Sequence, residues 1–270
     1  MNILHSPLIP AAILALSLCA CEKELDFDYA EIDPVTVIEA TLDMNGATVA
    51  ITQTTPMDEP MDTTLLTGAS VTLTDMTDGS RHTLMPDSDG KYLSATSGVP
   101  GHSYRIDVDI NGEQFSAQSV MQQPVRITDI AMEWIKMPYD RVAIVKVEFT
   151  DNPASTGDSY WLRLYRNGKP YRWSVGDDRA ASCGTISAIQ MTTRRDTTAE
   201  DDDDLLVDGD VIRATVAQID APMYRMLESL TAGGSNGPQL WQGRKPCLGY
   251  FLAAPVADTL IVFHPDSIPG

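Results

Sequence analysis

Hydrophobic and polar residues alternate in short runs along the first half of this chain. In the runs 69–75 and 104–110, apolar residues occupy every second position and polar residues occupy the positions between them. Period-two alternation places successive side chains on opposite faces of a strand. Turn signals such as Asn45-Gly46 and Asn111-Gly112 separate the runs. The pattern therefore predicts antiparallel strands joined by tight hairpins.

A strand predicted over 160–165 carries apolar groups on both of its faces. It is either buried on both sides or presents Trp161 and Tyr165 outward, and burial is the favoured interpretation. Exposed aromatic side chains are frequent anchors of binding interfaces. On that ground alone, the candidate ligand-contact residues are Trp161, Tyr165, Trp173 and Trp241.

One short helix is predicted near the end of the chain. Asp220 is suited to be its N-cap, Pro222 is tolerated in its first turn, and the helix then covers residues 223–230. Strands are predicted on both sides of this helix, over 211–219, 248–251 and 260–263.

These elements predict a mostly β fold with two domains. Residues 34–123 are predicted to form an immunoglobulin-like antiparallel β-sandwich, because about seven short strands follow one another with regularly spaced turn signals. Residues 124–270 are predicted to form a second β-rich domain, with one short helix and an acidic loop at 194–210.

The beginning of the chain predicts export and lipid attachment. An apolar run, Leu8–Leu18, ends in Leu18-Cys19-Ala20-Cys21, and the Leu and Ala before Cys21 are typical of a bacterial lipobox. The run is too short to cross a bilayer of ~30 Å. Cleavage before Cys21 removes residues 1–20 as a signal peptide, and acyl chains on Cys21 anchor the protein. An uncut signal peptide is the alternative, since no Lys or Arg precedes the apolar run.

Acidic residues follow Cys21 in a tether formed by residues 21–33. Acidic residues beside a lipidated cysteine resemble the surface-export signal of lipoproteins in Bacteroidetes-type bacteria, which implies display on the outer face of the outer membrane. A plain solvated linker is the alternative. Over the whole chain, 38 Asp and Glu against 19 Lys and Arg give a formal net charge of −19. Phosphate backbones repel such a chain, so nucleic acid is a poor partner.

The sequence leaves one disulfide open and gives little support to a metal site. Cys183 and Cys247 form either one disulfide or two separate buried thiols. No close spacing of Cys and His predicts a metal site. The segment 87–90 has alternate carboxylates but lacks the other calcium ligands, so a hairpin turn is predicted there. The acidic run 200–204 is predicted to be a solvated loop.

Two resemblances extend these interpretations. Ala-x-Val-x-Leu at Ala69, Asp-x-Asp-Gly-x-Tyr at Asp87 and Pro-Gly-x-x-Tyr at Pro100 look like the regulatory-type sandwich found beside carboxypeptidases and before outer-membrane transporters. This carboxypeptidase-regulatory-like resemblance covers residues 69–120.

The second resemblance spans nearly the whole mature chain. A Cys-Glu-Lys-Glu tether at Cys21, Phe-x-Asp-x-Pro at Phe149 and Leu-Gly-Tyr-Phe at Leu248 resemble the Bacteroidetes lipoprotein family called domain of unknown function 4249. Members resemble partners of TonB-dependent outer-membrane transporters by gene context, and no enzymatic activity is attached to the family. The acidic run 200–204 departs from the family pattern.

The leading functional hypothesis is a lipid-anchored, non-enzymatic surface binding or interaction module associated with TonB-dependent nutrient uptake. A structural or adhesion lipoprotein is an alternative, because tandem sandwiches suit that role equally. A hydrolase is the second alternative, but it needs a nucleophile, a base and an orienting group held together. His82, His102 and His264 lie in no recognisable motif. The sequence therefore predicts no catalytic residues, no cofactor and no metal.

Overall fold

The structure is a computed structural model in which contacts divide the chain into residues 1–33 and residues 34–270. The division falls where the first sandwich is predicted to begin, and all of the described strands belong to the second unit. The structure describes residues 33–56, 64–138, 140–151, 155–180, 184–194, 205–234 and 237–269.

A nine-stranded sheet in the order β14-β7-β6-β3-β4-β5-β2-β1-β15 surrounds the first core. Alternating burial along its strands follows the alternating hydrophobicity of the sequence, as in β6, where every second residue is buried. The strands are β1 (Thr36–Leu42), β2 (Ala47–Gln53), β3 (Ser70–Asp75), β4 (Arg81–Pro86), β5 (Tyr92–Ser94), β6 (Ser103–Ile110), β7 (Glu113–Val120), β14 (Gln242–Gly243) and β15 (Cys247–Ala253).

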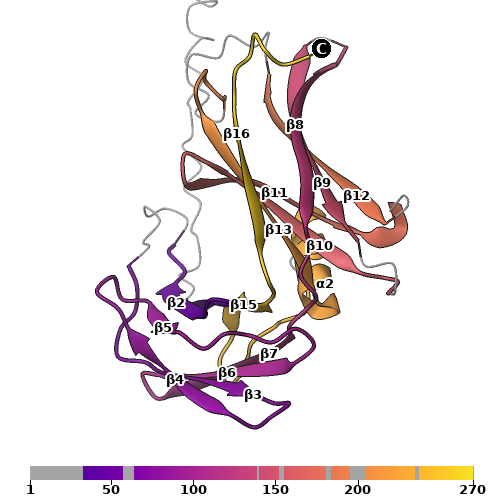
Figure 1. Cartoon of the computed structure of the whole chain (residues 1–270). Coiled ribbons are helices and arrows are strands. Elements are labelled where there is room, and N and C mark those ends of the chain that lie inside the picture. Colours follow the sequence, from indigo (N-terminus) through magenta and orange to yellow (C-terminus); the bar gives the residue numbers. More distant parts are fainter. Residues whose placement is uncertain are drawn as a thin grey trace, which may run out of the picture. The chain divides into compact units, whose positions relative to one another are not determined.

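Two of these strands come from the end of the chain. β15 pairs in parallel with β1 from Thr36↔Cys247 to Leu42↔Ala253, and β14 pairs with β7. Figure 1 shows the gold β15 beside the indigo strands at the start of the sheet. The predicted boundary at residue 123 therefore differs from the strand pairing, since residues 242–253 belong to the first sheet. Local periodicity predicted the strand at 248–251 but not its partner.

The hairpin turns follow the predicted turn chemistry. Asn111 and Gly112 both have positive φ, of 53° and 77°, and they join β6 to β7. Both central residues of a type I′ turn need this conformation, which Asn and Gly tolerate best. In segment 87–90, the Asp87 side chain accepts hydrogen bonds from the backbone N–H groups of Asp89 and Lys91, each at 2.9 Å. That segment joins β4 to β5, so the predicted hairpin turn is confirmed.

Two smaller sheets enclose the second core. They have the orders β11-β10-β13-β16 and β12-β9-β8, with apolar side chains of both sheets in one cluster. The mostly β fold with one α-helix among the described residues is confirmed. The strands are β8 (Ile127–Lys136), β9 (Arg141–Thr150), β10 (Ser159–Arg166), β11 (Lys169–Asp177), β12 (Thr185–Arg194), β13 (Val211–Ile219) and β16 (Ala257–Val262), with a 3-10 turn, η1, at Asp178–Ala180.

The helix α2 (Ala221–Thr231) begins as the sequence predicts. Asp220 is its N-cap and accepts a hydrogen bond from the N–H of Met223 at 3.0 Å. The other carboxylate oxygen of Asp220 accepts the Ser119 hydroxyl at 2.8 Å, and Ser119 in turn accepts the N–H of Ala253. One carboxylate thus caps the helix and ties it to β7. No helix in the described parts of the chain is long and apolar enough to cross a membrane.

Asp210, just before β13, gives the fold a pH-dependent contact. It is buried and accepts hydrogen bonds from Arg166 at 2.7 Å, Asn167 at 2.7 Å and the Val207 N–H at 2.8 Å. Burial raises the pKa of Asp210, but the hydrogen bonds from Val207, Asn167 and Arg166 together lower it by more, so the net shift is downward.

Because the pKa of Asp210 is lower in the folded protein than in the unfolded chain, its ionised carboxylate stabilises the fold at pH values above the unfolded pKa. This stabilisation is lost as the pH falls through the folded pKa. We therefore expect Asp210→Asn to lower the free energy of unfolding by about 2 kcal/mol at pH 7. The difference from the parent protein should shrink at acid pH, as urea titrations at pH 7 and pH 3 would reveal. Asp258→Asn is the control, because Asp258 pairs with Arg213 at the surface, and its effect should stay below about 0.5 kcal/mol. An equal Asp210→Asn effect at both pH values would contradict the assignment.

Candidate functional site

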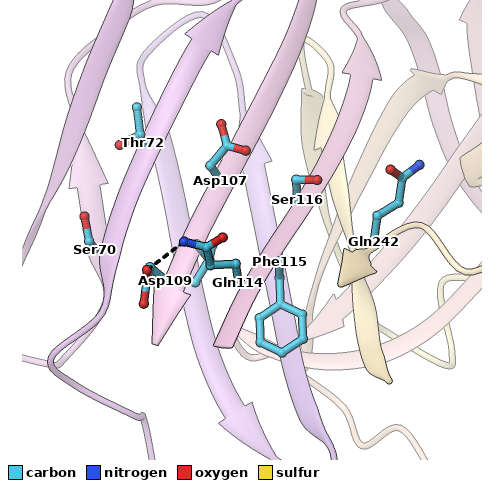
Figure 2. A pocket seen from close by; sticks show the side chains of 9 residues that line it. Ser70, Thr72, Asp107, Asp109, Gln114, Phe115, Ser116 and Gln242 are labelled. Atoms are coloured by element: carbon cyan, nitrogen blue, oxygen red, sulfur yellow. Dashed lines mark hydrogen bonds between the residues drawn. The ribbon is translucent and has the colours of Figure 1, made fainter. Parts of the chain in front are cut away.

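A polar hollow of about 370 Å³ lies on the outer face of the first sheet, over β3, β6, β7 and β14. Strand register arranges its side chains in two rows. Residues directly opposite each other on neighbouring strands share a face. The first row is Thr72, Asp107, Ser116 and Gln242, and the second is Ser70, Asp109 and Gln114. Figure 2 shows both rows on the same side of the strands.

The two rows form a grid of hydrogen-bonding groups on a rigid support. Strands lie about 4.8 Å apart and rows two residues apart are about 7 Å apart, so the longer row spans roughly 14 Å. Asp107 accepts the Arg105 Nε–H at 2.9 Å, and Asp109 accepts the Gln114 amide at 3.2 Å. Hydroxyl and amide groups both donate and accept, whereas the carboxylates accept. The grid is therefore suited to a flat ligand that carries several hydroxyl or amino groups.

The alternation that exposes these polar groups sends their apolar neighbours inward. Val108 and Phe115 border the hollow from below and are buried in the first core. In Figure 2 the Phe115 ring points away from the polar rows. The alternating pattern placed Asp107 and Asp109 opposite an apolar face, but it did not predict that four strands bring seven polar side chains together. Only the register between strands could have shown this grouping.

Three of the four predicted aromatic residues lie on one face of the sheet β11-β10-β13-β16. Trp161 and Tyr165 alternate with the core residues of β10, and Trp173 lies on β11 directly opposite Arg163. Trp173 is 37% exposed, Tyr165 is half-buried, and Trp161 is only 7% exposed. Burial of Trp161 confirms the favoured interpretation of the 160–165 strand.

Exposure was the basis for proposing ligand contacts, and that basis is wrong for two residues. Trp161 lies on the face of its sheet that α2 and β15 cover. Its ring packs edge-on against that of Tyr250, with the ring centres 5.6 Å apart. Trp241 is 3% exposed and lies in the first core, where its indole N–H donates to the Ile38 carbonyl at 3.0 Å. Both rings therefore stabilise the fold, and a direct ligand contact stays a prediction for Trp173 and Tyr165.

Arg163 joins this aromatic cluster. Its guanidinium carbon lies 4.3 Å from the centre of the Trp161 ring, a cation–π contact. Burial and the charge of Glu39, the register partner of Tyr250 on β1, raise the pKa of Tyr250 to about 12. The cluster thus links β10 to β15 through neutral rings and one cation.

Two groups of side chains are close enough to hold a cation. Asp75, Asp78 and His102 form one group, and Asp151, Asp158 and Asp178 form the other, with ligand atoms in each within 4.8 Å of one another. In both groups, a carboxylate also accepts backbone hydrogen bonds. Asp75 accepts them from the N–H groups of residues 77 and 78, and Asp178 accepts them from those of Gly157 and Asp158.

Histidine hydrogen bonds go to carboxylates in this structure. His102 Nδ1 lies 2.7 Å from Asp75, and His264 Nδ1 lies 2.8 Å from Asp208 at the surface. Burial raises the pKa of Asp75, but the hydrogen bond with His102 and those of the turn together lower it by more, so its pKa lies below the usual value. His82, the remaining histidine of the described residues, lies on β4.

The predicted cysteine sites are only partly within the described residues. Cys21 and Cys183 lie outside them, as does the acidic run 200–204. Cys247 is a free, buried thiol at the start of β15, and burial raises its pKa to about 12. A free, buried thiol at Cys247 agrees with the alternative of separate buried thiols and not with the Cys183–Cys247 disulfide.

Comparisons with known proteins identify no family. No family model matches the chain, and no curated protein matches it either. Among solved structures, the two fibronectin type-III domain segment from chicken tenascin matches with a TM-score of 0.25 and 10% identity, covering 86% of this chain and 100% of that one. The FN1–FN3 domains of chicken CNTN1 match with a TM-score of 0.24 and 11% identity, covering 69% of this chain and 60% of that one.

Proposed function

We propose that the protein is a non-enzymatic binding protein, anchored to the bacterial outer membrane by lipid on Cys21. In this proposal it is displayed at the cell surface and assists a TonB-dependent transporter in nutrient uptake. The lipobox Leu18-Cys19-Ala20-Cys21 supports the anchor, and the acidic tether supports surface display. The resemblance to the family of lipoproteins supports the transporter.

The observation that supports binding is the grid of polar side chains on the first sheet. Two rows of Asp, Gln, Ser and Thr side chains present hydrogen-bonding groups at fixed spacing. A rigid sheet loses little conformational entropy when a ligand binds, which favours affinity. A polar nutrient with several hydroxyl or amino groups fits this chemistry.

The tether supports action close to the membrane. Twelve residues separate Cys21 from Pro34, and a fully extended chain of that length reaches about 40 Å. The folded unit is therefore held within one domain length of the bilayer surface. A transporter in the same membrane lies within that reach.

The anchor is tested by Cys21→Ser in the full chain. We expect this variant to lose its acyl chains and to leave the membrane fraction almost completely after a high-salt wash, because only lipid holds the protein there. Cys19→Ser is the matched control, since Leu18 before Cys19 does not suit the peptidase. It should stay membrane-bound. Immunoblots of the fractions and the mass of the processed protein are the measurements.

The same membranes test the partner. Crosslinking of the parent protein followed by affinity capture should enrich an outer-membrane transporter, and Cys21→Ser should lose that enrichment. Membrane retention of Cys21→Ser at the normal processed mass would reject the anchor. Capture without any transporter would reject the partner while leaving the anchor intact.

A further inference from the structure

A second hollow, of about 380 Å³, lies between the edges of the two smaller sheets. β11 is the edge strand of one sheet and β12 is the edge strand of the other. Four consecutive residues of each strand, 174–177 and 186–189, line the hollow. Side chains alternate between the two faces of a strand, so four consecutive residues can line one hollow only along the strand's edge. The hollow therefore runs along two strand edges.

The hydrogen-bond pattern shows which backbone groups of β11 face this hollow. The Asp178 N–H donates to the Asp158 carbonyl at 3.0 Å, so this pair is a hydrogen-bonded one. Hydrogen-bonded and non-hydrogen-bonded pairs alternate along an antiparallel ladder. In the register of β10 and β11, the backbone groups of Gly176 consequently point toward β10. Those of Val175 and Asp177 point away from β10, into the hollow.

The same argument applies to β12. The Asp151 N–H donates to the Gly184 carbonyl at 2.9 Å, which sets the alternation in the register of β9 and β12. The backbone groups of Ser187 and Ile189 therefore point away from β9. No strand pairing joins β11 to β12 within the described ranges. Both edges thus present N–H and C=O groups suited to pairing with another strand.

The floor of the hollow is apolar. It opens onto the second core between the two sheets, where the rings of Phe149 and Tyr160 lie 5.0 Å apart. An added strand would send alternate side chains into this space and leave the others facing outward. The core residues that line the hollow are Phe149, Tyr160, Leu162, Ile186 and Ala188.

The charged residues that line the hollow are Asp177 and Arg179, and two further carboxylates contact tyrosines that line it. Asp177 accepts the Arg179 Nε–H at 2.7 Å, which neutralises one carboxylate with one cation. The hydroxyls of two lining tyrosines contact carboxylates: Tyr224 donates to Glu228 at 3.4 Å, and Tyr160 donates to Asp151 at 2.5 Å. Among the lining residues and their direct partners, the three carboxylates Asp177, Glu228 and Asp151 stand against the one cation Arg179, which favours a basic ligand.

We propose that an extended peptide segment of a partner protein binds here by adding as a strand to the edges of β11 and β12. Its apolar side chains enter the hollow, and its basic side chains face the surrounding carboxylates. Main-chain hydrogen bonds supply affinity in such strand addition, and the pocket for alternate side chains supplies specificity. This site is separate from the polar grid on the first sheet and does not depend on the lipid anchor.

The probe is an acetylated and amidated Lys-Val-Lys-Val-Lys-Val peptide, titrated against the detergent-solubilised full chain by fluorescence anisotropy. We expect it to bind at least about tenfold more tightly than Glu-Val-Glu-Val-Glu-Val. Methylation of its central backbone nitrogens should weaken binding by a similar factor. Hydrogen exchange should slow at the amides of Val175, Asp177, Ser187 and Ile189 in the complex.

Two substitutions block the site in different ways. A Cβ on Gly176 meets no atom within 4 Å, so Gly176→Phe should fill the hollow, whereas Gly176→Ala should leave it open. Ser187→Pro removes an N–H from the free edge, which edge strands tolerate, and Ser187→Thr keeps it. Gly176→Phe and Ser187→Pro should each weaken binding about tenfold or more, and the matched controls should stay within about twofold.

Equal binding of the N-methylated peptide would reject strand addition, and so would unchanged binding by both blocking variants. The two variants rest on different strands, so failure of one to fold leaves the other as the test. Self-association of the chain that Gly176→Phe abolishes, together with no peptide binding, would assign the edges to a second copy and overturn the proposal.

Discussion

Gly249→Ala is expected to lower the free energy of unfolding by about 3–5 kcal/mol, because it places an atom where β1 already lies. Gly249 has φ of 94°, a conformation that side chains disfavour. A Cβ there would lie 2.1 Å from the Ile38 carbonyl oxygen and 2.8 Å from its carbon. Both neighbours are backbone atoms, so the parallel pairing of β1 with β15 must yield. Urea unfolding followed by circular dichroism measures the change.

Gly79→Ala separates the clash from the backbone strain. Gly79 has a similar φ of 82°, but a Cβ there meets nothing within 4 Å. Its substitution should cost only about 1–2 kcal/mol, the cost of the left-handed conformation alone. If Gly249→Ala and Gly79→Ala destabilised the protein equally, close approach of β15 to β1 would be contradicted.

Trp241→Ala should lower the free energy of unfolding by about 3–5 kcal/mol, as large buried aromatic residues do on truncation. Trp241 lies in the first core although more than a hundred residues of sequence separate it from β7. Its loss leaves a cavity and removes the hydrogen bond to the Ile38 carbonyl. Trp241→Phe keeps most of the ring and loses the hydrogen bond, so about 1–3 kcal/mol is expected.

Trp173→Ala is the matched control for Trp241→Ala. Trp173 is 37% exposed, so its truncation should cost less than about 1 kcal/mol. Thermal unfolding of the three variants measures the order of the effects. A Trp241→Ala protein as stable as Trp173→Ala would show that the end of the chain does not complete the first core.

The Trp241 prediction also concerns the polar grid. Gln242, the next residue, forms β14 with Gly243 and supplies one end of the longer row. The grid therefore depends on docking of the C-terminal segment against β7. Loss of Trp241 should disturb the Gln242 end of the row before it disturbs the part on β3 and β6.

Local chemistry accounts for the elements that the sequence predicted. The alternation in 104–110 produced β6, because one face of the strand meets the core and the other meets water. Asn111-Gly112 produced a hairpin turn, and Asp220 produced a helix N-cap. Each of these results depends on residues within a few positions of one another, which a linear pattern contains.

The candidate site residues show the limit of such patterns. Four aromatic residues were chosen for exposure, yet Trp161 and Trp241 are buried. The local sequence around a tryptophan does not show whether the ring is buried, because burial depends on which other segment of the chain covers it. Sequence reasoning therefore selected Trp173 and Tyr165 together with two core residues.

Spacing over a few residues was enough to predict the mostly β class, many of the strands and turns, and the capped helix, while lipid attachment at Cys21 stays a prediction. Pairing between distant segments was needed to place β14 and β15 in the first sheet. The same pairing brings seven polar side chains into one grid and sets the edges of β11 and β12 along one hollow. Such features escape a linear pattern because hydrophobic period fixes which face of a strand is buried but does not specify the strand that pairs with it.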